Sequence, residues 1–254
     1  MTKPTVELLS VVVPAYRQEK SIVSDLQRIN RVLEKTELNY EIICVVDGKT
    51  DETFSLAKQL QTERLKVVGY EENRGKGYAV RFGMNMAEGD YVAFLDAGME
   101  IHPSGLSMLL EHMHWYQSDI IVGSLRHSAS KVQGYPVVRK VLSWGYHTLT
   151  KMLFGLNITD SQRGIKIFRK QVLDEVLPRL QIQRYAFDIE MLAVAYWLGF
   201  NQIHDGPVEF DARQVSYSSV SPQTVWSMFW DTVNFYYKLK IKKEYRSKPA
   251  QAKS

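Results

Sequence analysis

The stretch Tyr91–Glu100, YVAFLDAGME, contains an apolar and aromatic run that leads directly into an acid. Tyr91–Leu95 has the composition of a buried strand, and Asp96 follows it before a turn of small residues, Ala97 and Gly98. Such a strand places Asp96 at the carboxyl edge of a sheet, where open α/β sheets bind ligands. A carboxylate there needs a cation or hydrogen-bond donors. Two interpretations are open: Asp96 holds a divalent metal that carries a diphosphate, or it caps the next helix.

Strand and helix patterns alternate on both sides of this stretch. Short, β-branched apolar runs predict strands, and the segments between them keep the apolar spacing of helices. The predicted strands are Leu8–Val13, Tyr40–Val46, Leu65–Tyr70, Tyr91–Leu95 and Asp119–Ser124, and helices are expected near Ile22–Leu33, from Asp51, over Gly75–Glu88 and from Pro103. This alternation predicts an α/β fold with a mostly parallel sheet and helices on both faces.

The pattern changes after Ser124. Arg126–Gly134 is polar and is expected to be a loop, and Pro136 is well placed as the first residue of a long helix. The remaining predicted elements are a helix to Leu156, a short element at Ile165–Phe168, a strand near Val208–Phe210, and helices near Asp188–Leu198 and over Thr224–Ile241. We expect one domain over residues 1–220 and an amphipathic, basic appendage over residues 221–254.

Composition and charge exclude several function classes. The chain has 254 residues, 45% of them hydrophobic, and a single cysteine, Cys44, so an internal disulfide is excluded. No apolar window approaches the ~18 residues of a transmembrane helix. The net charge is +4, and the basic tail Lys238–Lys248 suggests an anionic surface. Basic residues elsewhere are not grouped with exposed aromatics, so no nucleic-acid partner is expected. The spacings of P-loops, zinc sites and serine-hydrolase elbows are absent.

Polar residues follow all five of the first predicted strands. They are Pro14, Tyr16 and Glu19, then Asp47, then Asn73, Arg74 and Lys76, then Asp96 and Glu100, then Arg126. Taken singly, each is more readily a solvated loop residue, but five parallel strands bring their carboxyl ends to one edge. Carboxylates suit Mg²⁺ or Mn²⁺, and Arg and Lys suit phosphate oxygens. The set therefore predicts a site for a metal-bound diphosphate.

Seven motifs stand in order along the chain. They are SVVVPAYRQE from Ser10, EIICVVDGKTDET from Glu41, NRGKGYAVRFG from Asn73, FLDAGME from Phe94, VGSLR from Val122, TDSQRGIKIFRK from Thr159 and RYAFDIEML from Arg184. This ordered set resembles family 2 inverting glycosyltransferases of the Rossmann-like GT-A fold, over roughly residues 8–220. It is most similar to their dolichyl- and polyprenyl-phosphate sugar synthases. The resemblance implies a nucleotide-sugar donor, a divalent metal and a lipid-phosphate acceptor.

The resemblance also implies roles for individual residues on the donor side. The nucleotide-sugar would bind to Pro14, Tyr16, Glu19, Asp47, Arg74, Lys76 and Asp96. Val46 stands where the family has an acid before Asp47. Gly98 replaces the second acid of the family's Asp-x-Asp, and Glu100 matches a nearby position that can also hold metal. We therefore expect Asp96 and Glu100 to bind Mg²⁺ or Mn²⁺.

On the acceptor side the resemblance implies a second set. Arg139, Ser143 and Gln162 would bind the acceptor, and Asp96, Arg126, Asp160 and Arg213 would be catalytic. Arg163 departs from the family pattern. The reaction would be an in-line displacement at the anomeric carbon with inversion, with Arg126 and Arg213 stabilising the leaving diphosphate. A phosphate acceptor, with a second pKa of about 6, needs no strong base, whereas a hydroxyl acceptor would need Asp160 or Asp188.

A lipid acceptor implies that the enzyme works at a membrane surface. The apolar stripes of Pro136–Leu156 and Thr224–Ile241 would lie in the interface or pack on the sheet. We expect peripheral attachment at the cytoplasmic face, with a homodimer or a membrane protein as a further partner. GDP-mannose and UDP-glucose are both open as donors. The alternatives are a glycosyltransferase acting on a polysaccharide or glycoconjugate hydroxyl and a non-catalytic nucleotide-binding relative.

Overall fold

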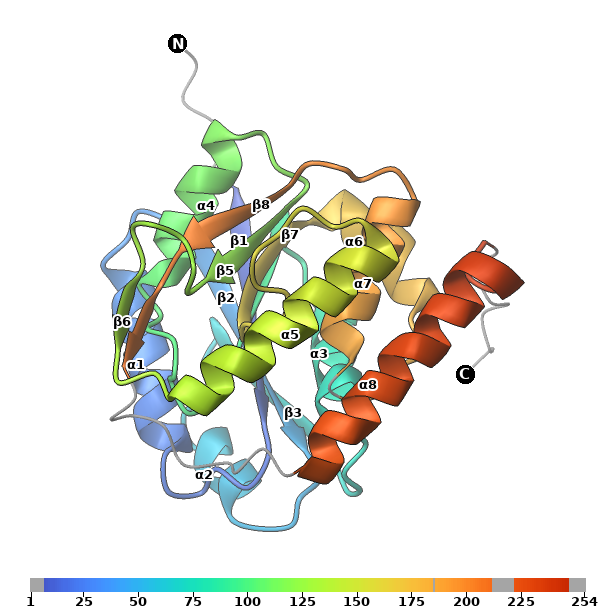
Figure 1. The fold of residues 1–254 in the computed structure, drawn as a ribbon. Coiled ribbons are helices and arrows are strands. Elements are labelled where there is room, and N and C mark those ends of the chain that lie inside the picture. The colour runs from blue at the N-terminus through green and yellow to red at the C-terminus, as the bar shows by residue number, and fades with distance from the viewer. Residues whose placement is uncertain (1–6, 185, 212–221, 247–254) are drawn as a thin grey trace.

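A seven-stranded sheet forms the centre of the computed structural model (Figure 1). The structure describes residues 7–184, 186–211 and 222–246, and the side chains of residues 138, 139, 211 and 222–224 also lie outside the description. The strands, in the spatial order β3-β2-β1-β4-β7-β5-β8, are β1 Leu8–Ala15, β2 Asn39–Asp47, β3 Leu65–Tyr70, β4 Tyr91–Leu95, β5 Ile120–Ser124, β7 Ile165–Arg169 and β8 Ile203–Pro207. The five strands predicted first are confirmed.

One strand runs against the others. β7 pairs antiparallel with both β4 and β5, while the other neighbours in this sheet pair in parallel. The amino end of β7 therefore lies at the same edge as the carboxyl end of β4, and Leu95 is the partner of Ile165. The amide of Asp96 donates to the carbonyl oxygen of Gly164 at 2.9 Å. The segment before β7 is thus delivered to the edge that carries Asp96.

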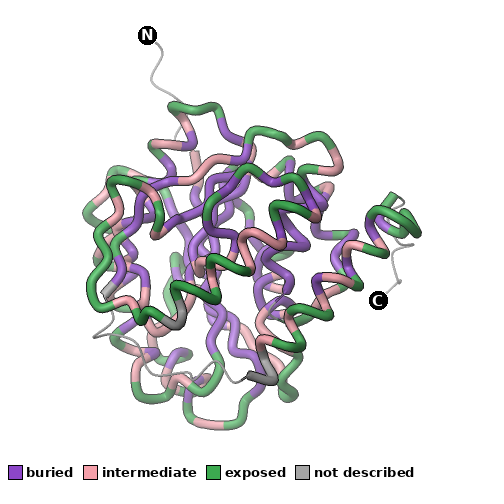
Figure 2. Tube along the Cα trace, viewed as in Figure 1, coloured by how far each residue is buried: buried purple, intermediate pink, exposed green. Residues whose placement is uncertain are grey.

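Helices cover both faces of the sheet, as predicted (Figure 1). On one face lie α1 Ile22–Glu34, α2 Thr53–Lys58 and α4 Gly105–Trp115, and on the other lie α3 Lys76–Asn85, α6 Lys170–Val176 and α7 Phe187–Trp197. Successive strand residues point to opposite faces of the sheet. Val12 packs in the hydrophobic cluster under α3, α6 and α7, and Val11 and Val13 pack in the cluster under α1, α2 and α4. Because both faces are covered, the inner strands β2, β1, β4, β7 and β5 are buried except at single end residues, whereas the edge strands β3 and β8 are only partly buried (Figure 2).

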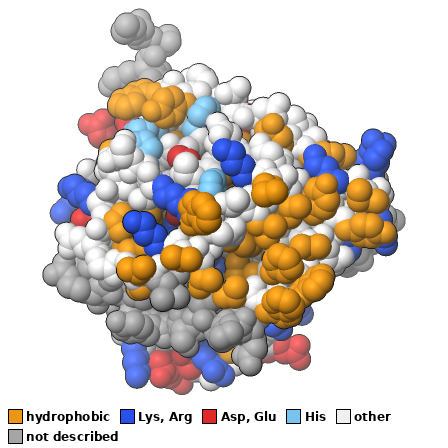
Figure 3. Space-filling view, in the orientation of Figure 1, with side chains coloured by type: hydrophobic (Ala, Val, Ile, Leu, Met, Phe, Trp, Pro, Cys, Tyr) orange, Lys and Arg blue, Asp and Glu red, His pale blue; other side chains and the backbone are white. Residues whose placement is uncertain are grey.

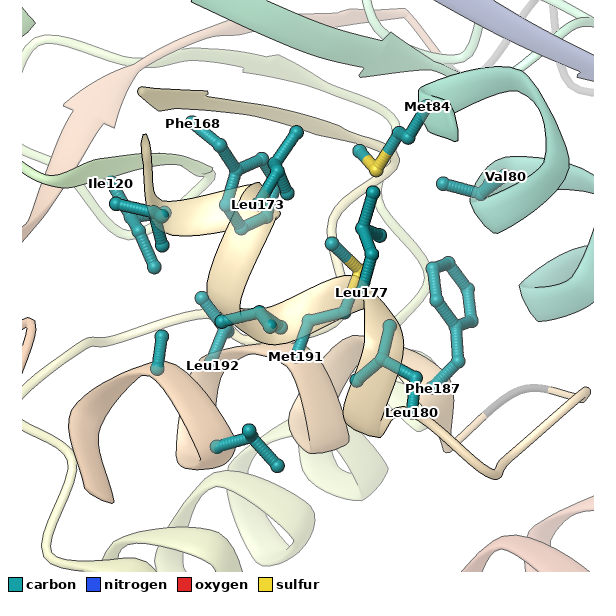
Figure 4. Close-up of a cluster of buried hydrophobic side chains, with 14 of the residues drawn as sticks. Val80, Met84, Ile120, Phe168, Leu173, Leu177, Leu180, Phe187, Met191 and Leu192 are labelled. Atoms are coloured by element: carbon teal, nitrogen blue, oxygen red, sulfur yellow. The ribbon is translucent and has the colours of Figure 1, made fainter. Parts of the chain in front are cut away.

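The hydrophobic cluster under α3, α6 and α7 joins β7 to these three helices. Figure 4 shows Phe168 of β7 packed with Leu173 of α6, Met191 of α7 and Met84 of α3. Each of these four side chains is at most 1% exposed. Their burial supplies the apolar contacts that hold β7, and with it the segment before β7, in the middle of the sheet.

Four details differ from the sequence predictions. The expected loop Arg126–Gly134 contains strand β6, Lys131–Gln133, which pairs in parallel with β9, Glu209–Asp211. The strand expected near Val208–Phe210 is two strands, because polar β8 is recruited by pairing with β5 and does not show an apolar pattern. Pro136 is the N-cap residue, and α5 spans Val137–Phe154. Helix α6 and the 3₁₀ turn Leu177–Arg179 were not predicted.

The C-terminal helix packs on the domain through a narrow face. It consists of α8, Pro222–Tyr236, and a π-helical segment, Tyr237–Lys242. Phe235 and Leu239 are 1% exposed and belong to the core, whereas Trp226 is 64% and Trp230 53% exposed. Most of the predicted stripe thus faces outward, and Figure 3 shows hydrophobic side chains gathered over α5 and α8. No described helix is both long and apolar enough to cross a membrane.

Gly83 tests the packing of α3 on the sheet. A Cβ at this position would lie 2.5 Å from Val12 Cγ1 and 2.8 Å from Val45 Cγ2, two fully buried strand residues. Gly83→Ala is expected to destabilise the protein by about 1–3 kcal/mol in urea unfolding, because overpacking outweighs the better helix propensity of alanine. The matched control is Gly145→Ala in α5, where a Cβ would meet nothing within 4 Å. A stabilised Gly83→Ala variant would contradict this packing.

Candidate active site

Asp96 and Lys76 form the charged centre of the carboxyl edge. Lys76 Nζ donates to Asp96 Oδ2 at 2.6 Å. Asp96 Oδ1 is buried and has no hydrogen-bond partner among the described residues. A Cβ on Gly164 would fall 2.0 Å from Asp96 Oδ2, so the close approach of the two segments requires glycine. The interpretation of Asp96 as a helix cap is wrong, because Ser104 is the N-cap residue of α4.

A second ion pair lies beneath the first. Lys166 Nζ donates to Asp188 Oδ1 at 2.5 Å and to the carbonyl oxygen of Arg163 at 2.6 Å. The side chain of Lys166 is 0% exposed and that of Asp188 5%. Burial lowers the pKa of Lys166 and raises that of Asp188, and their mutual attraction opposes both shifts. Asp188, one of the two bases considered for a hydroxyl acceptor, is thus engaged below the floor of the site.

Acids surround Lys76 on more than one side. Burial lowers the pKa of Lys76, but attraction to Asp96 and Asp188 outweighs it, so the net shift is upward. Glu100 also raises the pKa of Lys76, by a smaller amount, which places this carboxylate near the same cation. Lys76 therefore stays charged, and its ammonium group offsets part of the negative charge of the nearby carboxylates.

The turn after β4 leaves room where the family's second acid would stand. Gly98 has φ 87° and Met99 has φ 51°, so the chain reverses within two residues. A Cβ at Gly98 would meet nothing within 4 Å. In the described ranges no group of three or more His, Cys, Asp or Glu side chains could hold a metal ion. The donor atoms on this side are those of Asp96 and Glu100.

Asp47 organises the loop that leads to Lys76. Its carboxylate accepts hydrogen bonds from Tyr70 Oη at 2.9 Å and Asn73 Nδ2 at 2.9 Å. It also accepts the backbone N–H groups of Arg74 at 2.7 Å and Gly75 at 3.0 Å. Burial, followed by the Asp47 bond, raises the pKa of Tyr70. Asp47 is 3% exposed, so its described contacts shape this loop, a role that the sequence pattern did not reveal.

The residues predicted after β1 flank the same edge. Pro14 is buried in β1, opposite Val45. Tyr16 is 38% exposed, and the guanidinium of Arg17 lies 5.2 Å from the centre of its ring. Glu19 is exposed, and its Oε2 accepts the backbone N–H of Glu52 at 3.3 Å. An exposed tyrosine ring and an exposed acid thus border the loops after β1 and β2.

A cavity of about 370 Å³ adjoins this centre. It is lined by Leu125, Arg126, Val132, Tyr135, Lys140, Ser143, Asp160 and Arg163. The structure thereby brings together three of the predicted residues, because Arg126 Nη2 donates to Ser143 Oγ at 3.2 Å and Asp160 lies in the same wall. Nearby in sequence, Gln162 Nε2 is buried without a hydrogen-bond partner in the described part of the chain.

Arg163 links two other residues that line this cavity, Asp160 and Tyr135. Its Nε donates to Asp160 Oδ2 at 2.6 Å, and its Nη2 donates to Tyr135 Oη at 2.6 Å. Burial lowers the pKa of Arg163, but attraction to Asp160 outweighs it and the net shift is upward. Tyr135 and Lys140 were not among the predicted site residues. Tyr135 lies between β6 and α5 and Lys140 lies in α5, and only the folded chain brings both residues to the cavity that Arg163 lines.

Two predicted residues lie outside this geometry. Arg213 falls outside the described residues, and of Arg139 only the backbone, within α5, is described. The cavity lies next to the Asp96 centre, because Arg163 in the cavity wall directly precedes Gly164, whose carbonyl oxygen accepts the hydrogen bond of the Asp96 amide. Chemically, the edge offers carboxylates and a lysine beside a basic cavity.

Comparisons with known proteins identify a family and similar relatives. The profile of the family described as Glycosyl transferase family 2 matches residues 10–177. A dolichyl-phosphate beta-glucosyltransferase of Drosophila melanogaster is 34% identical over 207 residues, which are 76% of this chain and 63% of that protein. The Dictyostelium discoideum protein of the same name is 30% identical, over 74% of this chain and 62% of that protein. The chain thus spans somewhat less than two thirds of these two relatives.

Solved structures share the fold. Glucosyl-3-phosphoglycerate synthase of Mycobacterium tuberculosis, in complex with Mn²⁺, uridine diphosphate and phosphoglyceric acid, aligns with a TM-score of 0.68. The alignment covers 91% of this chain and 78% of that chain, with 18% sequence identity. This likeness confirms the predicted GT-A type of sheet and its surrounding helices.

Proposed function

The chain belongs to glycosyl transferase family 2, and on this premise we propose that it transfers a sugar from a nucleotide-sugar to a polyprenyl or dolichyl phosphate. The names of the similar relatives, which specify glucose and dolichyl phosphate, favour UDP-glucose over GDP-mannose as the donor. The observation that carries the proposal is the pairing of an acidic edge with an adjoining basic cavity. The edge suits the donor diphosphate, and the cavity suits an anionic acceptor.

The donor side fits a divalent cation. Asp96 Oδ1 is buried without a partner among the described residues, and Glu100 lies near the same lysine. Hard carboxylate oxygens of this kind suit Mg²⁺ or Mn²⁺, and we propose that these two residues hold the ion. When bound, it would neutralise the charge that develops on the leaving diphosphate. Pro14, Tyr16, Glu19 and the loop shaped by Asp47, with Arg74 and Lys76, would hold the nucleotide-sugar.

The acceptor side supplies positive charge rather than a base. Arg126 and Ser143 line the cavity and would bind the acceptor phosphate, whereas the resemblance implied the leaving diphosphate as the partner of Arg126. On the resemblance alone, we propose Gln162 and Arg139 as further acceptor-binding residues and Arg213 as a residue that binds the diphosphate. The phosphate oxygen would attack the anomeric carbon as the bond to the diphosphate breaks, with inversion. The nucleoside diphosphate leaves with the electron pair. Because the acceptor is already ionised near neutral pH, no proton has to be removed.

Transfer to lipid is the direct test. The protein would be incubated with a polyprenyl phosphate in detergent, radiolabelled UDP-glucose or GDP-mannose, and Mg²⁺ or Mn²⁺. We expect label in the organic phase with UDP-glucose. If no common donor gives an extractable product, the lipid acceptor is refuted and a polysaccharide or glycoconjugate hydroxyl becomes the alternative. Nucleotide binding without turnover on any acceptor would identify a non-catalytic relative.

We further propose that the protein attaches peripherally to the cytoplasmic face of a membrane. The outward faces of α5 and α8 expose Val137, Val141, Leu142, Trp144, Met152, Trp226, Phe229, Trp230, Tyr237 and Ile241 (Figure 3). We call this set the α5–α8 apolar surface. Large contiguous apolar patches on a protein surface mark interaction sites. Lys240, Lys242 and Lys243 flank Ile241 at the C-terminal end of this surface, which suits anionic headgroups.

Vesicle binding tests this attachment. The double variant Trp226→Ala/Trp230→Ala is expected to bind anionic phospholipid vesicles about tenfold more weakly in co-sedimentation, because two large apolar side chains no longer insert. Trp115→Ala is the control, since Trp115 is 70% exposed but belongs to α4. Unchanged vesicle binding would refute this surface as the membrane contact. Concentration-dependent association of the wild-type protein, lost in the double variant, would identify a homodimer interface instead.

A further inference from the structure

The guanidinium of Arg163 is held in the floor of the cavity with donors to spare. Its hydrogen bonds to Asp160 and Tyr135 use Nε and one N–H of Nη2, out of the five N–H donors that an arginine carries. The side chain is 12% exposed and lines the cavity. The guanidinium carbon also lies 5.0 Å from the centre of the Tyr135 ring. These contacts fix the plane of the fork before any ligand arrives.

The same contacts decide whether Asp160 can act as a general base. Asp160 is 3% exposed, and one of its carboxylate oxygens is paired with Arg163 at 2.6 Å. A general base has to reach the proton that it removes and to gain by taking it. A carboxylate committed to a buried arginine meets neither condition, because protonation would leave the arginine unpaired. The arrangement suits a group that orients Arg163.

We infer that Arg163 is a binding residue for the acceptor phosphate, that Asp160 and Tyr135 position it, and that the acceptor is therefore a phosphate monoester rather than an alcohol. This inference rests on the proposed function and assigns to Arg163 a role that the family pattern does not supply.

The charge of the cavity agrees with a dianion. Its lining contains Arg126, Lys140 and Arg163 against Asp160, three cations and one anion, for a net charge of +2. A phosphate monoester carries about −1.5 to −2 near neutral pH. An alcohol would leave this positive charge uncompensated in a partly enclosed space. Leu125 and Val132 add an apolar wall, which suits a phosphate attached to a hydrocarbon chain.

The backbone places Arg163 beside the donor centre. The carbonyl oxygen of Arg163 accepts a hydrogen bond from the buried Lys166 at 2.6 Å. The next residue, Gly164, accepts the Asp96 amide at 2.9 Å. The first contact fixes the Arg163 peptide to β7, and the second joins the following peptide to Asp96, directly after β4. A phosphate bound by Arg163 would thus lie on the side of the cavity nearest to the transferred sugar.

Two variants of Arg163 test this role: one keeps its positive charge, and the other removes that charge together with the charge of Asp160. Arg163→Lys keeps a cation but cannot span Asp160 and Tyr135, so the Michaelis constant for polyprenyl phosphate is expected to rise at least about tenfold. The Michaelis constant for the nucleotide-sugar should stay within about twofold. Arg163→Gln/Asp160→Asn removes both charges, so no unpaired buried charge remains to unfold the protein. It should show the same selective loss.

A matched control separates this effect from general damage. Arg179 is a similarly buried arginine, paired with Glu175 at 3.1 Å and remote from the cavity. Arg179→Lys should leave both Michaelis constants unchanged. If Arg163→Lys also leaves the acceptor constant unchanged, the inference is overturned. It is equally overturned if Asp160→Asn lowers kcat at saturating acceptor and abolishes its rise with pH, since that behaviour belongs to a general base.

Equilibrium binding distinguishes this inference from the proposed function. Titration of the wild-type protein with farnesyl phosphate and with farnesol requires no turnover. We expect saturable binding of the phosphate and at least about tenfold weaker binding of the alcohol, with the difference removed in Arg163→Lys. Equal binding of both probes overturns the inference. A wild-type protein that binds farnesyl phosphate through Arg163 but transfers no sugar contradicts the proposed function alone.

Discussion

Asp96→Asn is expected to lower the rate of sugar transfer by at least about 10³-fold, because the variant loses the charge that we propose holds a divalent metal and the donor diphosphate. The amide oxygen of asparagine can still accept the bond from Lys76, which joins Asp96 Oδ2 at 2.6 Å. The fold should therefore survive, with a melting temperature close to that of the wild type. Transfer is measured with saturating donor and acceptor, and stability by thermal unfolding of the same preparations.

The control for this variant is an acid outside the site. Asp174→Asn changes a surface residue of α6 that lies 3.7 Å from Lys170, with a side chain 59% exposed. Its transfer rate should match that of the wild type. Wild-type turnover in Asp96→Asn would refute the metal assignment. Gross unfolding of Asp96→Asn would mean instead that the pair with Lys76 is required for the fold.

Lys166→Met is expected to cost about 3–5 kcal/mol of folding free energy, because it leaves the Asp188 carboxylate buried without its cation. The bond between the two side chains is 2.5 Å long, and Lys166 is 0% exposed. The double variant Lys166→Met/Asp188→Leu should recover most of the loss, since it replaces two buried charges by apolar groups of similar size. Denaturant unfolding of the wild type and the three variants completes a double-mutant cycle.

A surface pair provides the comparison. Lys49 and Glu71 lie 2.6 Å apart, with side chains 32% and 78% exposed. Lys49→Met should change stability by no more than about 1 kcal/mol, because water screens the pair. A Lys166→Met variant as stable as Lys49→Met would show that Asp188 is protonated or solvated in the folded protein, and would remove the second ion pair from the site.

Much of the donor side could be predicted because it depends on local pattern. The strand before Asp96 and the polar ends of β1, β2 and β3 follow from apolar runs and the residues that end them. The roles of these residues are less local. Asp47 was expected to bind the nucleotide-sugar, and in the structure its carboxylate accepts hydrogen bonds from Asn73, Arg74 and Gly75. That contact depends on β2 and β3 pairing, which no short window of sequence encodes.

The acceptor side was predictable in its residue types but not in its connections. The resemblance pointed to Arg126, Ser143 and Asp160, and the structure places all three around one cavity. It did not indicate that Arg163 would be paired with Asp160, or that Tyr135 would close the far side. Tyr135 lies between β6 and α5, and β6 exists only because it pairs with β9, far along the chain.

The sequence by itself determined that this chain forms alternating strands and helices and that Asp96 ends a buried strand, because hydrophobic periodicity and strand-ending residues act over a few positions. Tertiary structure alone decided that β7 enters antiparallel between β4 and β5. That placement gains the burial of Phe168, Leu173 and Met191, contacts between elements that are distant in the chain (Figure 4). It also brings Gly164 against Asp96 and sets Arg163 beside the carboxyl edge of the sheet.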